Sequence, residues 1–200
     1  MKTLREWTDD LYRRFESLRH APGTLARLKV AMNVFIPYLE NRCDVHHPET
    51  LTLEHIHGFQ AHLAQRRTRK GLPMKPASIN TVIKGVRAFL DLLDDCGCLR
   101  RPLAKKLDYV REPNLLPTGV LTHAEVRKLL RKLGAQSSEG VRDRAALELM
   151  YSSGLRIGEL VAITLPDLDL EAGVVRVIGK GQKERFVPVG KTALKWLRSY

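Results

Sequence analysis

The sequence is poor in cysteine and has no long apolar run. Three cysteines occur in 200 residues, an odd number that argues against a disulfide scaffold and for a reducing cytosol. No apolar run approaches the ~18 residues that a membrane-spanning helix needs. The first residues carry Asp9 and Asp10 and lack the apolar stretch of a signal peptide. We therefore expect a cytoplasmic protein that does not contact a membrane.

The residue spacing of a metal site is also missing. Cys96-Gly-Cys98 has no partner cysteines, so small buried or loop thiols explain it better than zinc does. His55, His57 and His62 do not share one helical face, and no Cys or carboxylate lies at ligand spacing from them. We expect no bound metal.

Acidic residues are in short supply relative to basic ones. The chain has 34 Lys and Arg against 22 Asp and Glu, a formal net charge of +12 that is spread over both halves. Such an excess indicates a polyanionic partner, most often nucleic acid. Two basic runs flank one segment: Arg66, Arg67, Arg69, Lys70 with Lys75, and Arg100, Arg101, Lys105, Lys106. They favour phosphate contacts, although a solvated surface would look similar.

Helical periodicity dominates the first hundred residues. Apolar residues recur at helical spacing over residues 7–18, 25–39, 56–63 and 79–93. Thr52 is a plausible N-cap, Gly97 a plausible stop, and Pro37 should kink or shorten the second helix. Residues 1–100 therefore predict an antiparallel helical bundle.

The second half begins after a segment without sustained periodicity. Residues 101–119 contain Pro102, Pro113, Pro117 and Gly119 and are predicted to be a linker. Residues 120–200 open with a capping box at Thr122 and continue with helices near 141–152 and from 156 to Pro166. Strands are predicted over 174–178 and 186–189, with a turn between them, before a last amphipathic helix. The predicted fold is mainly α, with a small antiparallel sheet in the second part.

Arg156 is the first candidate for chemistry. Gly154 can end one helix, and the next begins almost at once. This places Arg156 at a helix N-terminus, where backbone N–H groups also attract anions. A guanidinium can bind two phosphate oxygens together. The competing interpretation is a surface arginine paired with Glu159 or Asp143.

Lys180 is the second candidate. It lies between Gly179 and Gly181 at the tip of the predicted hairpin, where glycines allow close approach of a backbone. The segment is not a nucleotide-binding P-loop, because the spacer is wrong and Gly181 stands where Ser or Thr would bind magnesium.

A third set of candidates lies on the helix around residues 79–93. Asn80, Lys84 and Arg87 fall at i, i+4 and i+7, opposite the apolar stripe. These side-chain types read bases or hold phosphates in a major groove, but a solvated polar face is an equal alternative. With Lys75 and Arg101, they are the predicted DNA contacts.

Two stretches resemble a known family. RDRAALELMYSSGLRIGELVAITLPDLDL, followed by GVVRVIGKGQKERFVPVG, closely resembles the catalytic domain of tyrosine recombinases, the phage-integrase family, and is most similar to bacterial Xer-type members. The first hundred residues resemble the family's SAM-like, helical core-binding domain. The resemblance implies a core-binding domain over 1–100, a linker over 101–119 and the first part of an α+β catalytic domain over 120–200.

This resemblance implies a specific chemistry. Such enzymes cut and rejoin double-stranded DNA through a 3′-phosphotyrosine intermediate without a metal or nucleotide cofactor, as part of a four-subunit synapse. Arg156 would neutralise charge on the phosphate, Lys180 would protonate the leaving 5′-oxygen, and Glu159 would support them. The implied location is the bacterial cytoplasm.

The chain departs from the family pattern downstream. No His-x-x-Arg motif follows Lys180, since no histidine follows His123, and we interpret Tyr200 as an ordinary helix residue. The chain is then a truncated recombinase that binds DNA but does not cleave it alone. The alternatives are an inactive module that occupies recombination sites and a helical protein-interaction domain whose basicity is incidental.

Overall fold

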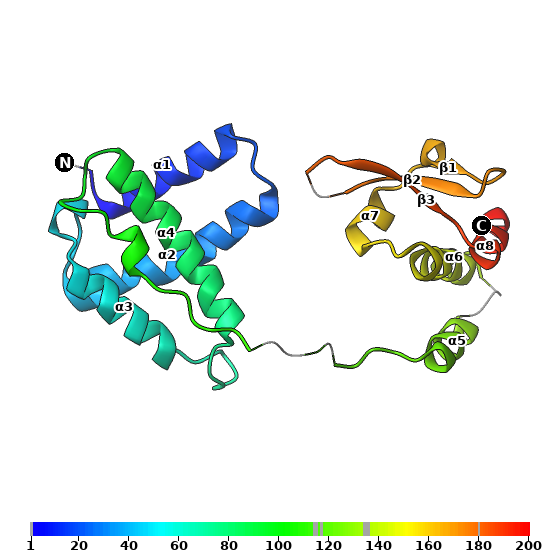
Figure 1. Cartoon of the computed structure of the whole chain (residues 1–200), viewed down its shortest axis with the longest axis horizontal. Helices are drawn as coiled ribbons and strands as arrows, with labels where there is room; N and C mark the ends of the chain where they lie inside the picture. The colour runs from blue at the N-terminus through cyan, green and yellow to red at the C-terminus, as the bar shows by residue number, and fades with distance from the viewer. Residues whose placement is uncertain (1, 114–115, 117, 134–136, 180) are drawn as a thin grey trace. The chain divides into compact units, whose positions relative to one another are not determined.

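A computed structural model describes residues 2–113, 116, 118–133, 137–179 and 181–200. The chain divides into two compact units, Met1–Leu115 and Leu116–Tyr200, which are shown in Figure 1. No helix in these described ranges has both the length and the apolar character needed to cross a membrane.

The first unit is a bundle of four α-helices, which confirms the predicted architecture (Figure 1). The helices are α1 (Leu4–Ser17), α2 (Pro22–Cys43), α3 (Leu53–Gln65) and α4 (Pro76–Asp95), with a 3-10 turn, η1 (Pro48–Thr50), before α3. Thr52 caps α3 as predicted, its hydroxyl accepting a hydrogen bond from the His55 N–H.

The core of this unit forms where α2 packs on α4. Phe35 contacts Phe59 and Phe89 edge-on, with ring centroids 4.7 and 6.4 Å apart, an arrangement that aromatic rings favour. A methyl group on Gly85 would overlap Ala31 of α2, so the glycine sets how closely the two helices approach.

Pro37 does not end α2, contrary to one expectation from the sequence. The helix continues to Cys43 with Pro37 inside it. Proline costs one backbone hydrogen bond, but the flanking residues Phe35, Ile36 and Leu39 are all buried. Their burial outweighs the local loss.

The segment predicted to begin the linker belongs to the first unit instead. Leu103 and Leu107 are buried in the bundle core on either side of the 3-10 turn η2 (Ala104–Lys106), and Val110 packs against that core. We call residues 103–112 the strap. Apart from the single 3-10 turn η2, the strap is neither helix nor strand, so its apolar residues have no regular spacing. This is why periodicity suggested a linker from residue 101.

The second unit combines short helices with a small sheet (Figure 1). It contains α5 (His123–Lys132), α6 (Ser138–Ser153), α7 (Ile157–Ala162), the 3-10 turn η3 (Leu165–Asp167) and α8 (Lys191–Ser199). Strands β1 (Leu168–Asp169), β2 (Val174–Ile178) and β3 (Glu184–Pro188) form an antiparallel sheet in the order β1-β2-β3. The predicted mixed α+β architecture is confirmed.

Two details of this unit differ from the prediction. The helix expected to run from Arg156 to Pro166 ends at Ala162, because Thr164 and Asp167 form a capping box that starts the separate turn η3. The two-residue strand β1 was not predicted, since it is too short to show alternation. Val175 and Val177 of β2 point into the small core.

Candidate functional site

Arg156 is presented to solvent by a tight turn between two helices. Gly154 ends α6 in a left-handed conformation with φ of 61°, which glycine adopts without strain. Leu155 is buried and anchors the turn. Arg156 is then the N-cap of α7, with extended backbone, and its side chain is 74% exposed.

A buried carboxylate lies directly beneath this arginine. Glu159, on the first turn of α7, has a side chain only 5% exposed. Its Oε2 accepts a hydrogen bond from the Arg156 backbone N–H at 3.0 Å, and its Oε1 accepts one from Arg156 Nη1 at 2.9 Å. Glu159 therefore fixes both ends of the Arg156 residue.

The alternative of a paired arginine is thus partly realised. Within the described ranges, Glu159 is the partner of the Arg156 guanidinium, while Asp143 pairs with Arg142 at 2.8 Å. A single Nη1 contact leaves the other side of an exposed guanidinium facing solvent, and that geometry suits an incoming anion.

Arg185 on β3 completes the arrangement, and sequence reasoning did not identify it. Its Nη1 donates to Glu159 Oε1 at 3.0 Å and its Nη2 to Glu159 Oε2 at 2.9 Å. These hydrogen bonds, followed by the Arg156 backbone N–H, lower the pKa of the Glu159 carboxyl to about 2. Glu159 is therefore ionised at neutral pH. Strand alternation places Arg185 on the same face as the half-buried Val187, two residues later, but it does not identify Glu159 as the partner.

Lys180 lies outside the described residues, so its predicted role stays a prediction. Its neighbour Gly179 is described: its N–H donates to Lys183 O at 2.8 Å. A Cβ on Gly179 would lie 3.1 Å from Arg185 Nη1 and 3.4 Å from Glu159 Oε1. The hairpin end thus packs closely against the Glu159–Arg185 pair.

In the first unit, two predicted DNA contacts hold the strap instead. The Asn80 amide donates to Val110 O at 2.9 Å and accepts from the Val110 N–H at 2.8 Å. Arg87 Nε donates to Leu107 O at 2.9 Å, and its guanidinium lies 4.3 Å from the centre of the Tyr109 ring. In this structure, both side chains bind a neighbouring segment of the chain, and their contact with DNA stays a prediction.

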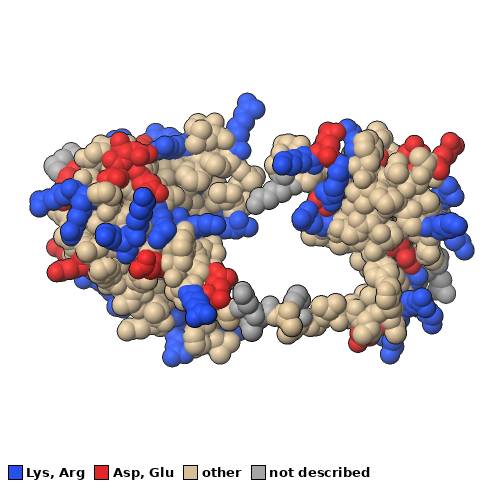
Figure 2. All heavy atoms as spheres, viewed as in Figure 1, with Lys and Arg blue, Asp and Glu red and all other residues tan. Residues whose placement is uncertain are grey.

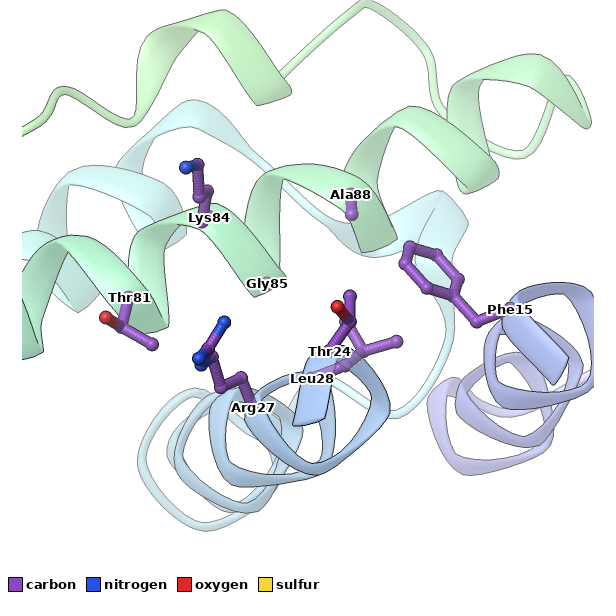
Figure 3. Close-up of a pocket in the computed structure, with 8 residues that line it drawn as sticks. All are labelled: Phe15, Thr24, Arg27, Leu28, Thr81, Lys84, Gly85 and Ala88. Carbon is purple, nitrogen blue, oxygen red and sulfur yellow. The ribbon is translucent and has the colours of Figure 1, made fainter. Parts of the chain in front are cut away.

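Lys84, the third residue of that predicted face, is exposed, as are Lys75 and Arg101. Lys84 borders a groove of about 460 Å³ between α2, α4 and the end of α1. Figure 3 shows Arg27 and Thr81 at one end of it and Phe15 at the other. The lining residues are Phe15, Thr24, Arg27, Leu28, Thr81, Lys84, Gly85 and Ala88. The groove thus combines an apolar floor with two cations from different helices.

On the face drawn in Figure 2, basic and acidic side chains are mixed on both units. Among the described residues, no three His, Cys, Asp or Glu side chains are grouped to hold a metal ion. The guanidinium and ammonium groups described above are able to bind an anion.

Comparisons with known proteins show which family the chain is similar to. Residues 119–200 match the model of the phage integrase family. Tyrosine recombinase XerD of Listeria innocua is 34% identical over 178 residues, which are 89% of this chain and 58% of that protein. XerC of Salmonella typhi is 39% identical over 137 residues, 68% of this chain and 44% of that protein.

The chain belongs to the phage integrase family of tyrosine recombinases. It spans about half the length of the curated relatives it matches.

Solved integrase structures agree with this family fold. A lambda integrase tetramer bound to a Holliday junction matches with a TM-score of 0.72 at 19% identity, over 100% of this chain and 56% of that one. A lambda integrase dimer bound to a COC′ core site matches with a TM-score of 0.73 at 18% identity, over 98% and 68%. At these identities the likeness concerns the fold.

Proposed function

We propose that this chain is the DNA-binding first part of a Xer-type site-specific recombinase. Its first unit, the core-binding domain, binds the backbone of double-stranded DNA, and its second unit, the start of the catalytic domain, brings Arg156 to a scissile phosphate. The observation that carries the proposal is the exposed Arg156 guanidinium, held by a buried and ionised Glu159. Such a group binds phosphate oxygens without first having to be ordered.

The chemistry follows from where the charges lie. Arg156 would neutralise the negative charge that grows on the phosphate oxygens during attack. Lys180, next to Gly179 on the hairpin, would donate a proton to the leaving 5′-oxygen. In the longer parent, a tyrosine outside these 200 residues would attack the phosphate and form the 3′-phosphotyrosine link, within a four-subunit synapse in the bacterial cytoplasm. This scheme requires no metal or nucleotide.

For the first unit, we propose DNA contacts by exposed cations. Lys84 and Arg27 border the groove between α2 and α4. Lys75 is exposed directly before α4, and Arg101 is exposed two residues before the strap. Asn80 and Arg87 are left out of this set because their hydrogen bonds hold the strap.

Binding to a short fluorescein-labelled duplex, followed by anisotropy as salt rises, tests the DNA-binding claim. We expect the logarithm of the association constant to fall linearly with the logarithm of salt concentration. R156M should lower that slope by about one. R142M is the matched control, since Arg142 is an arginine of the same unit paired with its neighbour Asp143. Equal slopes for R156M and R142M would remove Arg156 from the phosphate site.

A suicide duplex that traps phosphotyrosine separates binding from cleavage. We expect no covalent adduct with the 200-residue chain, because we do not assign Tyr200 as the nucleophile. Tyr200 is an exposed residue directly after α8. An adduct on a denaturing gel would show that the chain cleaves DNA. Absence of any salt-dependent binding would instead favour a protein-interaction domain.

A further inference from the structure

Glu159 is a bridge between two arginines, and this geometry has a consequence for charge. Each carboxylate oxygen accepts one hydrogen bond from Arg185 and one from Arg156. On the Arg185 side, both are guanidinium donors in the bidentate arrangement that is strongest for this pair. On the Arg156 side, one donor is the backbone N–H and only one is the guanidinium.

The two arginines therefore have different roles at Glu159. Arg185 supplies the two-point contact that neutralises the buried carboxylate, and a buried carboxylate requires such a partner. Arg156 makes one guanidinium contact and remains 74% exposed. With two cations and one anion, the cluster keeps a net charge of +1, located on the side that faces solvent.

The surrounding backbone is shaped around the Arg185–Glu159 contact. Arg185 pairs with Val177 across the β2–β3 ladder, which fixes its position relative to the sheet. Gly179 leaves room for the pair, since a Cβ there would lie 3.1 Å from Arg185 Nη1. The contact is thus part of how the strand ends and α7 fit together.

We propose that Arg185 is a positioning residue for Arg156: by neutralising Glu159, it keeps the Arg156 guanidinium oriented and electrically available for a DNA phosphate. This inference rests on the proposed function of Arg156. Without Arg185, Arg156 becomes the sole partner of Glu159, the cluster has zero net charge, and the guanidinium turns onto the carboxylate.

The neighbouring Arg176–Asp167 pair offers a matched control. Arg176 on β2 donates to Asp167 Oδ1 through Nε at 3.0 Å and Nη2 at 2.7 Å. Like the Arg185 pair, it joins a strand arginine to an acid in or near α7. In the described residues it has no contact with Arg156. Loss of Arg176 removes the same charge from the same sheet without releasing Glu159.

The test measures salt slopes of duplex binding for the 200-residue chain and its variants. We expect R185M to lower the slope by about one, as R156M does, and the R156M/R185M double variant to lower it no further. R176M should leave the slope unchanged. R185K, which keeps the charge, should stay near the unsubstituted chain and guards against a folding defect in R185M.

A charge-removing rescue distinguishes positioning from a purely structural or direct role. In E159Q/R185M the carboxylate charge is gone, so Arg156 is free again and the slope should return; D167N/R176M controls for the general gain of positive charge. Failure of E159Q to rescue R185M, or an R176M slope equal to that of R185M, would overturn the proposal.

Failure of the proposed function gives a different result. If R156M leaves the slope unchanged, Arg156 is not a phosphate ligand. The side-chain ¹⁵N resonance of Arg156 then still reports the coupling, and it should move in R185M and return in E159Q/R185M. An Arg156 resonance indifferent to R185M would overturn the positioning role itself.

Discussion

The two units differ in what fills their interiors. Among the described residues, the first unit has a continuous cluster of buried apolar side chains contributed by all four helices and the strap. In the described part of the second unit, the buried members of the cluster are fewer, and partly buried apolar side chains surround them. The buried members are Leu149, Leu155, Val175, Val177, Val189 and Ala193. Apolar burial therefore stabilises the first unit much more than the second.

Buried polar groups show the opposite distribution. Among the described residues of the first unit, the buried polar side chain is that of Thr8, which donates to the Leu4 carbonyl. In the second, Glu148 and Glu159 are buried and paired with Arg144 and Arg185. Ion pairs thus occupy part of the second unit's interior. One of these buried acids, Glu159, lies beneath Arg156, the candidate phosphate ligand.

This contrast indicates that the interiors of the two units serve different purposes. A bundle with an apolar core provides a stable platform that needs no particular charge state. A unit joined by arginine–carboxylate pairs can hold charged groups in fixed places, at the cost of dependence on pH. Variants that remove one kind of interaction at a time test the contrast directly.

The largest expected effect is loss of a core aromatic ring in the first unit. Phe89 is fully buried against Phe35, so F89A should lower the free energy of unfolding by about 3–5 kcal/mol. Trp7 lies in the first unit and Trp196 in the second. Fluorescence of Trp7 in a W196F background therefore follows the first unit alone during urea unfolding.

Phe186 provides the control for this variant. It lies on β3 with 72% of its surface exposed, and F186A should change stability by no more than about 0.5 kcal/mol. A similar loss for both variants, or a loss for F89A in the Trp196 signal of a W7F background, would contradict a core confined to the first unit.

Periodicity predicted the regular elements of both units well. The stripe over residues 79–93 is buried along α4 as expected, with Val82, Val86 and Phe89 among its members. A helix with one buried face has apolar residues about every 3.6 positions, so this spacing in the sequence indicates which face packs against the core. The same reasoning found β2 and β3 through their valines.

Irregular and polar contacts do not produce a periodic pattern in the sequence. The strap buries Leu103 and Leu107 without a period, and the polar face of α4 could equally serve solvent, DNA or another segment. Asn80 binds the strap, and nothing in its spacing reveals that choice. For Arg156, pairing with Glu159 was one of two interpretations, but the role of Arg185 depends on a contact across 26 positions of the chain.

A smaller effect is expected from releasing the strap. N80L removes both hydrogen bonds between the Asn80 amide and the Val110 backbone, and a third from the Asn80 amide to the Glu112 carboxylate. We expect a loss of about 1–2 kcal/mol in strap stability. Trypsin cleavage after Arg111 should then become faster.

T81A is the control for the strap variant. Thr81 lies on the same helix and donates only to the Ala77 carbonyl within it. T81A should leave cleavage after Arg111 unchanged. An unaltered cleavage rate in N80L would mean that apolar burial of Leu103 and Leu107 is sufficient to hold the strap.

The smallest effect at neutral pH, and the one specific to the second unit, is its response to acid. Hydrogen bonds from Arg185 lower the pKa of Glu159 to about 2, and those from Thr164 and Arg176 lower the pKa of Asp167 to about 2. The ordinary values are 4.5 and 3.8. Between about pH 2 and pH 4.5, the folded unit therefore binds fewer protons than the unfolded chain. Stability from both carboxylates is complete above about pH 4.5 and is lost as the pH falls toward 2.

Thermal unfolding followed by Trp196 in a W7F background measures this dependence. We expect a flat midpoint down to about pH 5 and a fall below it, and E159Q/D167N should make the curve shallower. In a W196F background, the same substitutions should leave the Trp7 signal of the first unit unchanged. An acid slope that persists in E159Q/D167N would assign the response to other carboxylates and break the link between the second unit's buried charge and its pH dependence.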